Sequence, residues 1–399
     1  MQNSHRQLVV ILIAFFTIAQ LAILFIFGYT PYPDSEGYVY LAKESIHYQQ
    51  FYPVRELINK YPFLWNIGAV NAVVLSLWLF HSVTPLLILY SIMKGATAWF
   101  LYDITKTLSG QKPALITLII YILYPANYGE GTSTLSELPF MFFCMLALWL
   151  GINKKWLVLG GVMLAVANWF RPMAVIFLVA LTVYYFQQNR KKMLLPVIGY
   201  TALILLIGSV SFLNKGLFLY QAKTGWMALA DYSSQHADIS MDVRNHQEWD
   251  VAQKDAQWRN IFIDWVADHP MDYVAQIPEK LVNTFISDNV NMCTFIPDKM
   301  EKEYMYEEVS MSALLHHFPH YTAVQWLTVY NLLFYYSLLL LFICGLFYSN
   351  KQLTLIPVTI ITCGTLILIF FAHGEARFHI PFMPFVIMVS SLFVHKKYW

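Results

Sequence analysis

Two carboxylates stand directly behind a long apolar run near the start of the chain. The run, residues 8–27, is long enough to cross a bilayer, and the stretch TPYPDSEGYVYLAKE (30–44) follows it with Asp34 and Glu36. Carboxylates beside the hydrocarbon are costly unless they have a partner or a function, and one function is to accept a proton as a general base. The structural alternative is that Asp34 caps the next helix and that Glu36 lies in its first turn, where the helix dipole favours negative charge.

A second charged group lies between two apolar runs near the end of the chain. The stretch HGEARFHIPFMP contains His373, Glu375, Arg377 and His379. An arginine side chain offers a planar fork that matches phosphate, so these residues predict a phosphate-binding site. The alternative is an interfacial pair of Glu375 with Arg377 that ends a helix.

Three single charges interrupt other apolar stretches. Arg171 in NWFRPMA could bind a ligand or extend its head group to the interface, while the following proline explains the break in the helix. Glu137 in TSTLSELPF could belong to the site or complete a capping box with Thr134. Lys94, within an apolar run, predicts an acidic partner and a functional role.

The composition identifies the elements that must position these charges. The chain has 399 residues, of which 58% are hydrophobic and 12% are charged, whereas soluble domains carry about 25% charged residues. We therefore expect an all-α polytopic membrane protein, and no arginine-rich patch suggests a nucleic-acid partner. Ten apolar stretches are candidate transmembrane helices: 7–29, 84–105, 113–128, 137–151, 156–170, 172–187, 195–215, 323–348, 353–371 and 380–395.

Charge distribution predicts the topology. If the N-terminus is inside, the lysines and arginines of the short turns collect on the cytoplasmic side, and the 216–322 segment, with 16 acidic and 7 basic residues, lies outside. Segment 61–80 is apolar enough to cross, but crossing would move four lysines of later turns outside. We therefore expect it to lie in the outer leaflet, with a true span as the alternative. The unusual charges near the membrane edges then all face the outside, whereas Lys94 lies within a span.

These boundaries divide the chain into three parts. Residues 1–215 are expected to form an N-terminal transmembrane core with a first outer loop at 30–80. Residues 216–322 form an extracytoplasmic region, and 323–399 form the C-terminal transmembrane helices.

Four stretches, in order along the whole chain, resemble a known enzyme family. They are YPDSEGYVYLA, STLSELPFMFF, NWFRPMA and GEARFHIPFMPF. The chain resembles membrane glycosyltransferases of the GT-C superfamily, close to bacterial members of the protein-mannosyltransferase and aminoarabinose-transferase group. The resemblance implies a bundle with outer juxtamembrane helices and a large first outer loop. One departure is that Ser35 separates the two acidic residues, which are often adjacent in the family. Another is that the chain has no appended soluble domain, so the acceptor class does not carry over.

The resemblance also implies residue roles. It places the catalytic carboxylate on Asp34 and the donor-phosphate site on Arg377 and Arg171. Glu137 and Glu375 match acidic positions whose roles vary in the family. Our reading of the chemistry adds that Glu36, with Glu137, positions the acceptor or an ion, and that His373, Glu375 and Lys94 support the site. No cofactor is required by the sequence, and a divalent metal held by Glu36 stays an open alternative.

The implied reaction has defined partners. A polyprenyl-phosphate-linked sugar would be the donor, and a hydroxyl of a glycan, lipid or protein would be the acceptor, with inversion at the anomeric carbon. The expected location is the bacterial cytoplasmic membrane, with the active site facing outward among membrane lipids. Two alternatives stay open: a transporter or lipid flippase, and a related oligosaccharide ligase or polymerase.

Overall fold

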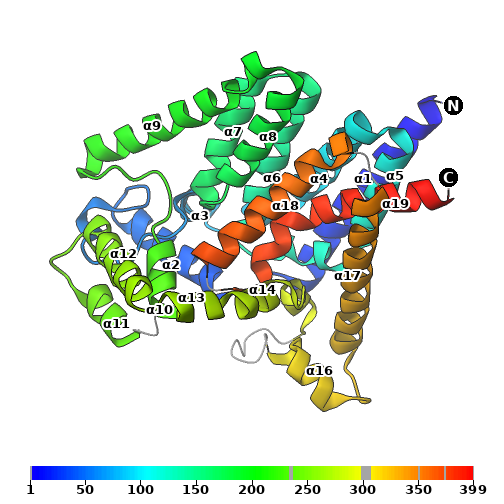
Figure 1. The fold of residues 1–399 in the computed structure, drawn as a ribbon. Helices are drawn as coiled ribbons and strands as arrows, with labels where there is room; N and C mark the ends of the chain where they lie inside the picture. Colours follow the sequence, from blue (N-terminus) through cyan, green and yellow to red (C-terminus); the bar gives the residue numbers. More distant parts are fainter. Residues whose placement is uncertain (1, 233–236, 298–306, 349–350, 373, 399) are drawn as a thin grey trace.

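The computed structural model describes residues 2–232, 237–297, 307–348, 351–372 and 374–398, and within these ranges the fold is helical without a β-strand. Figure 1 shows long helices packed side by side, with both termini at the end of the bundle away from a cluster of shorter helices. The helices that match the ten predicted spans are α1 (Gln2–Phe27), α4 (Thr84–Ser109), α5 (Gln111–Leu123), α6 (Glu137–Trp149), α7 (Leu157–Phe170), α8 (Val175–Gln188), α9 (Leu195–Lys215), α17 (Ala323–Tyr348), α18 (Lys351–Phe371) and α19 (Met383–Tyr398).

The expectation of an all-α membrane protein is confirmed. Seven helical segments of the described chain are long and apolar enough to cross a membrane: His5–Phe27, Thr84–Ser109, Glu137–Lys154, Arg190–Lys215, Ala323–Phe347, Thr354–Phe371 and Ala376–Lys396. Four further apolar helices are shorter: α3 (Ile67–Phe80), α5, α7 and α8. Fourteen residues of helix extend about 21 Å, which is less than the roughly 30 Å of a bilayer's hydrocarbon core. Helix length alone therefore does not separate α3 from α5, α7 and α8.

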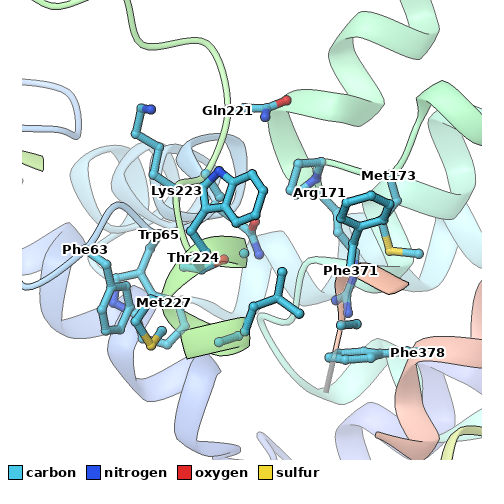
Figure 2. Close-up of a pocket in the computed structure, with 18 of the residues that line it drawn as sticks. Phe63, Trp65, Arg171, Met173, Gln221, Lys223, Thr224, Met227, Phe371 and Phe378 are labelled. Atoms are coloured by element: carbon cyan, nitrogen blue, oxygen red, sulfur yellow. The ribbon is translucent and has the colours of Figure 1, made fainter. Parts of the chain in front are cut away.

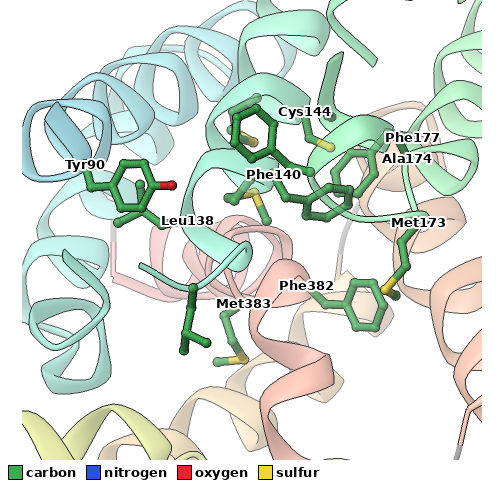
Figure 3. Close-up of a cluster of buried hydrophobic side chains, with 14 of the residues drawn as sticks. Tyr90, Leu138, Phe140, Cys144, Met173, Ala174, Phe177, Phe382 and Met383 are labelled. Atoms are coloured by element: carbon green, nitrogen blue, oxygen red, sulfur yellow. The ribbon is translucent and has the colours of Figure 1, made fainter. Parts of the chain in front are cut away.

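Helix α6 lies at the centre of the fold. It packs against α4 on one side and α7 on another, and a short π-helical turn, Leu150–Lys154, continues it. Its apolar side chains Phe140 and Cys144 are fully buried together with Phe177 of α8 (Figure 3). Most of α6 is buried, and its first residue, Glu137, has a fixed position at the end of the bundle.

The contact between α7 and α9 depends on small residues. A side-chain Cβ atom at Gly161 would lie 1.9 Å from the carbonyl oxygen of Pro196, so only glycine allows this approach. Small residues bring helices together in membranes in this way, where water does not drive their association.

The 216–322 segment is folded into short helices: α10 (Gly225–Tyr232), α11 (Ala237–Asn245), α12 (Val251–Asp268), α13 (Pro270–Ala275), α14 (Ile277–Phe285), the 3₁₀-helix η6 (Val290–Phe295) and α16 (Met311–His317). Asp250 begins α12 with a complete capping box that includes Gln253. Ala230, Val243 and Trp258 form a small hydrophobic core of this part, separate from the main core.

Candidate active site

Four segments that are distant in sequence meet at one end of the bundle. They are the start of α2 (Pro33–His47), the start of α6, the turn between α7 and α8, and the 3₁₀-helix η7 (Ala376–Phe382). Pro33 occupies the first position of α2, where its fixed backbone angle and missing N–H suit a helix start. The N-cap of α2 is Tyr32, which makes no side-chain capping bond. The alternative in which Asp34 caps the helix is therefore wrong, and Asp34 and Glu36 both lie in the first helical turn, as that alternative expected for Glu36.

Arg377 connects Asp34 to the last part of the chain. Its Nη1 atom lies 2.7 Å from Asp34 Oδ2, and its Nε atom lies 2.7 Å from Glu375 Oε1. Gly374 lets the chain turn from α18 into this position, because its φ is +76° and a Cβ atom there would lie 2.8 Å from the Cα atom of Lys280. The expected Glu375–Arg377 pair is present, and it shares its arginine with the carboxylate from the opposite end of the sequence.

The Asp34 carboxylate is enclosed but retains access to a cavity. Its side chain is 25% exposed. Burial raises the pKa of Asp34 above its ordinary value of 3.8; the positive charge of Arg377 opposes this effect, and the negative charge of Glu137 adds to it. A carboxylate with a raised pKa that still contacts solvent is suited to accept a proton from a bound hydroxyl.

A second arginine pair lies beside the first. Arg171 Nη1 lies 2.5 Å from Glu137 Oε1, with only 11% and 6% of the two side chains exposed. Arg171 ends α7 in an extended conformation because Pro172 follows it, and this directs the side chain toward the start of α6. Arg171 is therefore held in an ion pair and lines the cavity. The N-cap of α6 is Ser136, without a side-chain capping bond, so the predicted capping box of Glu137 with Thr134 is also wrong.

These charges border one cavity of about 520 Å³. Asp34, Arg171, Glu375 and Arg377 line it, whereas Glu137 lies behind Arg171. In Figure 2, one wall carries Phe63, Trp65 and Met227, and the opposite wall carries Arg171, Met173, Phe371 and Phe378. The volume is within the usual range for small-molecule sites, about 300–1,000 Å³. The cavity thus combines a potential base, two guanidinium groups and extensive aromatic surface.

The remaining predicted site residues lie elsewhere. Glu36 is in the same helical turn as Asp34 but on another face, and it does not line the cavity. Lys94 is buried in α4 and has the acidic partner that its position predicts, Glu130, but it also does not line the cavity. His373 lies outside the described residues.

A buried polar cluster that the sequence did not suggest lies near Lys94. Asp288 is 2% exposed, accepts a hydrogen bond from the hydroxyl of Tyr124, and lies 3.7 Å from Nε2 of His379. The other ring nitrogen of His379 is 2.7 Å from the carbonyl oxygen of Thr284. His379, two residues after Arg377, therefore connects η7 to the 216–322 segment rather than facing the cavity.

Two further residues that line the cavity, Trp65 and Asn66, were not predicted as site residues from the sequence. Asn66 donates hydrogen bonds to the Tyr38 hydroxyl at 2.8 Å and to Ser136 Oγ at 3.1 Å, and so joins α2 and the segment before α3 to the start of α6. Trp65 packs edge-on to Tyr38. Aromatic residues are common at membrane interfaces, so Trp65 could not be distinguished in the sequence from an interfacial anchor.

The described residues do not contain a group of three histidine, cysteine, aspartate or glutamate side chains that could hold a metal ion. The three carboxylates nearest the cavity, on Asp34, Glu137 and Glu375, are each paired with an arginine. Each of these three carboxylates therefore already has a cationic partner.

A comparison with protein-family models and a comparison with curated proteins both find no match to this chain.

Proposed function

We propose that the chain is an inverting glycosyltransferase that moves a sugar from a polyprenyl-phosphate carrier to a hydroxyl acceptor. One observation carries the proposal: a carboxylate with a raised pKa, Asp34, lines the same cavity as two guanidinium groups, those of Arg377 and Arg171. Proton acceptance and phosphate binding are the two functions that transfer from a sugar phosphate requires. Three of the four resembling sequence stretches contribute these residues.

Asp34 acts as the general base. The acceptor oxygen attacks the anomeric carbon, the bond from that carbon to the phosphate oxygen breaks, and the acceptor proton passes to Asp34. General-base catalysis contributes roughly 10²–10⁴-fold to the rate. Because a single displacement forms no covalent intermediate with the enzyme, the configuration at the anomeric carbon inverts.

Arg377 stabilises the leaving phosphate, with Arg171 as a second cation on the same cavity. A preorganised hydrogen-bond donor beside a developing negative charge lowers the activation free energy by roughly 2.7–4 kcal/mol. The attacking and leaving oxygens lie on opposite sides of the anomeric carbon, so the base and the phosphate-binding group are not in contact during the reaction. The 2.7 Å contact between Asp34 and Arg377 therefore opens when the donor binds, and the donor phosphate replaces Asp34 as the partner of Arg377.

The location of the site supports a lipid-linked donor. Leu368 and Phe371, at the end of α18, line the cavity beside the charges, and Phe371 is largely exposed. An isoprenoid chain could reach the site along this apolar surface. We propose that α5, α7 and α8 also cross, which gives ten spans, and that α3 lies in the outer leaflet. Nucleotide sugars are cytoplasmic, so an outward-facing site in a bacterial cytoplasmic membrane requires a carrier lipid.

The release of free polyprenyl monophosphate tests this function. The full chain in lipid nanodiscs would be given polyprenyl-phosphate-linked hexoses and pentoses with a mixture of saccharide, lipid and peptide acceptors. We expect the wild type to release the monophosphate and the Asp34→Asn variant to release at most about one per cent as much. Glu36→Gln is the matched control, because Glu36 shares the helical turn but does not line the cavity. A transporter would release no monophosphate, and a ligase would use only diphosphate-linked donors.

A further inference from the structure

The cavity has two walls of different chemistry. The donor-side wall is formed by the end of α18, the turn after α7 and Phe378. The facing wall, which we call the aromatic wall, carries Phe63, Trp65, Asn66, Lys223, Thr224, Trp226 and Met227. Its rings are Phe63, Trp65 and Trp226. Asp34 and Arg377 line the same cavity, so a molecule bound on the aromatic wall would share the cavity with the base.

The aromatic wall is rigidly supported. The backbone N–H of Lys223 donates to the carbonyl oxygen of Leu64 at 2.8 Å, which joins its two segments. Phe63 and Trp226 both pack against the small core of Ala230, Val243 and Trp258. The ring of Trp65 is 5.0 Å from that of Phe63 and packs edge-on to Tyr38. The rings of Phe63, Trp65 and Trp226 are therefore held in place before any ligand binds, which lowers the entropic cost of binding.

Polar groups on this wall carry no net charge. Asn66 and Thr224 line the cavity among the rings. The single cation of the wall, Lys223, is 2.7 Å from Asp255, which lines the same cavity. A phosphorylated or otherwise anionic ligand would therefore find no uncompensated positive charge here, and a cationic ligand no uncompensated negative charge.

We propose that the aromatic wall is the acceptor subsite and that the acceptor is a neutral saccharide; this inference rests on the proposed function. A sugar ring has an apolar C–H face that stacks on aromatic rings and a rim of hydroxyls that amide and hydroxyl side chains bind. The aromatic wall offers both kinds of group. It presents one acceptor hydroxyl to Asp34, while the donor occupies the opposite wall. A seryl or threonyl peptide would leave most of these rings without a matching surface.

Saturation-transfer NMR on the full chain in nanodiscs tests the subsite without a donor. The probes are neutral disaccharides of gluco, manno and galacto configuration, a phosphorylated disaccharide, and a serine-containing hexapeptide. We expect saturation transfer to at least one neutral disaccharide, little to its phosphorylated form and none to the peptide. Trp226→Ala should remove the signal, and Trp226→Phe should retain part of it. The control is Trp326→Ala, an exposed position on α17 that does not line the cavity.

The transfer reaction separates this inference from the proposed function. With an active donor, Trp226→Ala should raise the acceptor KM at least tenfold and leave the donor KM unchanged, with a melting curve to show that the variant is folded. Transfer to the peptide, or to the phosphorylated sugar in preference to the neutral one, would overturn the saccharide subsite and leave the glycosyltransferase intact. No saturation transfer to any neutral disaccharide would also overturn it. Saccharide binding without donor consumption would instead refute the proposed function.

Discussion

Arg377 contacts Asp34 at 2.7 Å although 342 positions lie between them in the chain, and the same guanidinium also contacts Glu375 at 2.7 Å. The contact joins the first turn of α2 to the segment that follows α18. One arginine therefore lies between two carboxylates that border the same cavity. Under the proposed function, a donor phosphate would compete with both carboxylates for Arg377, so these two contacts would affect donor binding as well as the ionisation of Asp34.

The acid limb of the pH–rate profile should reflect Asp34. The base must be ionised, so activity falls as pH drops through its pKa. Because burial raises the pKa of Asp34 above 3.8, we expect the loss at a higher pH than for an ordinary aspartate. Because the positive charge of Arg377 lowers the pKa of Asp34, removing it should raise that pKa. The residual activity of Arg377→Gln should therefore be lost at a higher pH than the activity of the wild type. Transfer rates between pH 4 and 8 measure the pH at which activity is lost. The same pH in the wild type and in Arg377→Gln would contradict the ion pair between Asp34 and Arg377.

Donor use should depend on the shape of the Arg377 side chain as well as on its charge. Arg377→Lys retains the charge but loses the planar fork, and Arg377→Ala loses both. We expect the donor KM to rise in both variants and to rise more in the alanine variant. Removal of one preorganised hydrogen-bond donor beside a developing negative charge typically lowers the rate about 10²–10³-fold. Equal donor use by the wild type and Arg377→Ala would exclude Arg377 from the phosphate site.

The pair of Arg171 with Glu137 should contribute to stability as well as to the site. Glu137→Gln would leave Arg171 buried without its carboxylate, and breaking a buried pair costs about 3–5 kcal/mol. We expect a lower melting temperature and weaker donor binding, with partial recovery in Glu137→Asp. Glu36→Gln, at a position outside the cavity, should change neither measurement. A Glu137→Gln variant that melts like the wild type would show that Arg171 finds another partner.

The membrane topology can be tested at two exposed positions. In a background without the native cysteines, Lys60→Cys should react with an impermeant thiol reagent in intact cells, and Lys112→Cys only after permeabilisation. Both positions are exposed. The expectation follows from the distribution of lysine and arginine between the two faces. If the reagent reaches both positions in intact cells, α3 crosses the membrane.

The sequence predicted the long helices because apolar run length is a direct consequence of bilayer thickness. The predicted spans 195–215 and 323–348 coincide with α9 and α17. Span 113–128 was too long because Pro125 lacks an amide N–H and ends the regular helix, so α5 stops at Leu123. Segment 61–80 was likewise too long, since its first six residues form the irregular stretch that carries Trp65.

Charged residues of the site were visible because a charge beside hydrocarbon requires an explanation. Asp34, Arg171, Glu375 and Arg377 were found in this way, and the structure brings them to one cavity. Asp288 could not be predicted as a buried residue, because it is one of 16 acidic residues in a segment expected to be exposed to solvent. Its burial depends on contacts with Tyr124 and His379, which only the tertiary fold brings together.

The final prediction concerns Lys94, which the sequence placed in a supporting role at the site. The structure pairs it with Glu130 inside the bundle, with its ammonium group 5.4 Å from the centre of the Tyr121 ring. Lys94→Met or Glu130→Gln alone would leave one buried group without its partner, at a cost of about 3–5 kcal/mol.

The double variant Lys94→Met/Glu130→Gln removes both charges, so it should be more stable than either single variant. Because neither residue lines the cavity, its donor KM should equal that of the wild type. Melting curves and donor titrations on all four proteins form a double-mutant cycle that measures the coupling. If the double variant melts like the wild type but no longer binds the donor, Lys94 contributes to donor binding after all. Additive losses of stability would show that the two side chains do not interact.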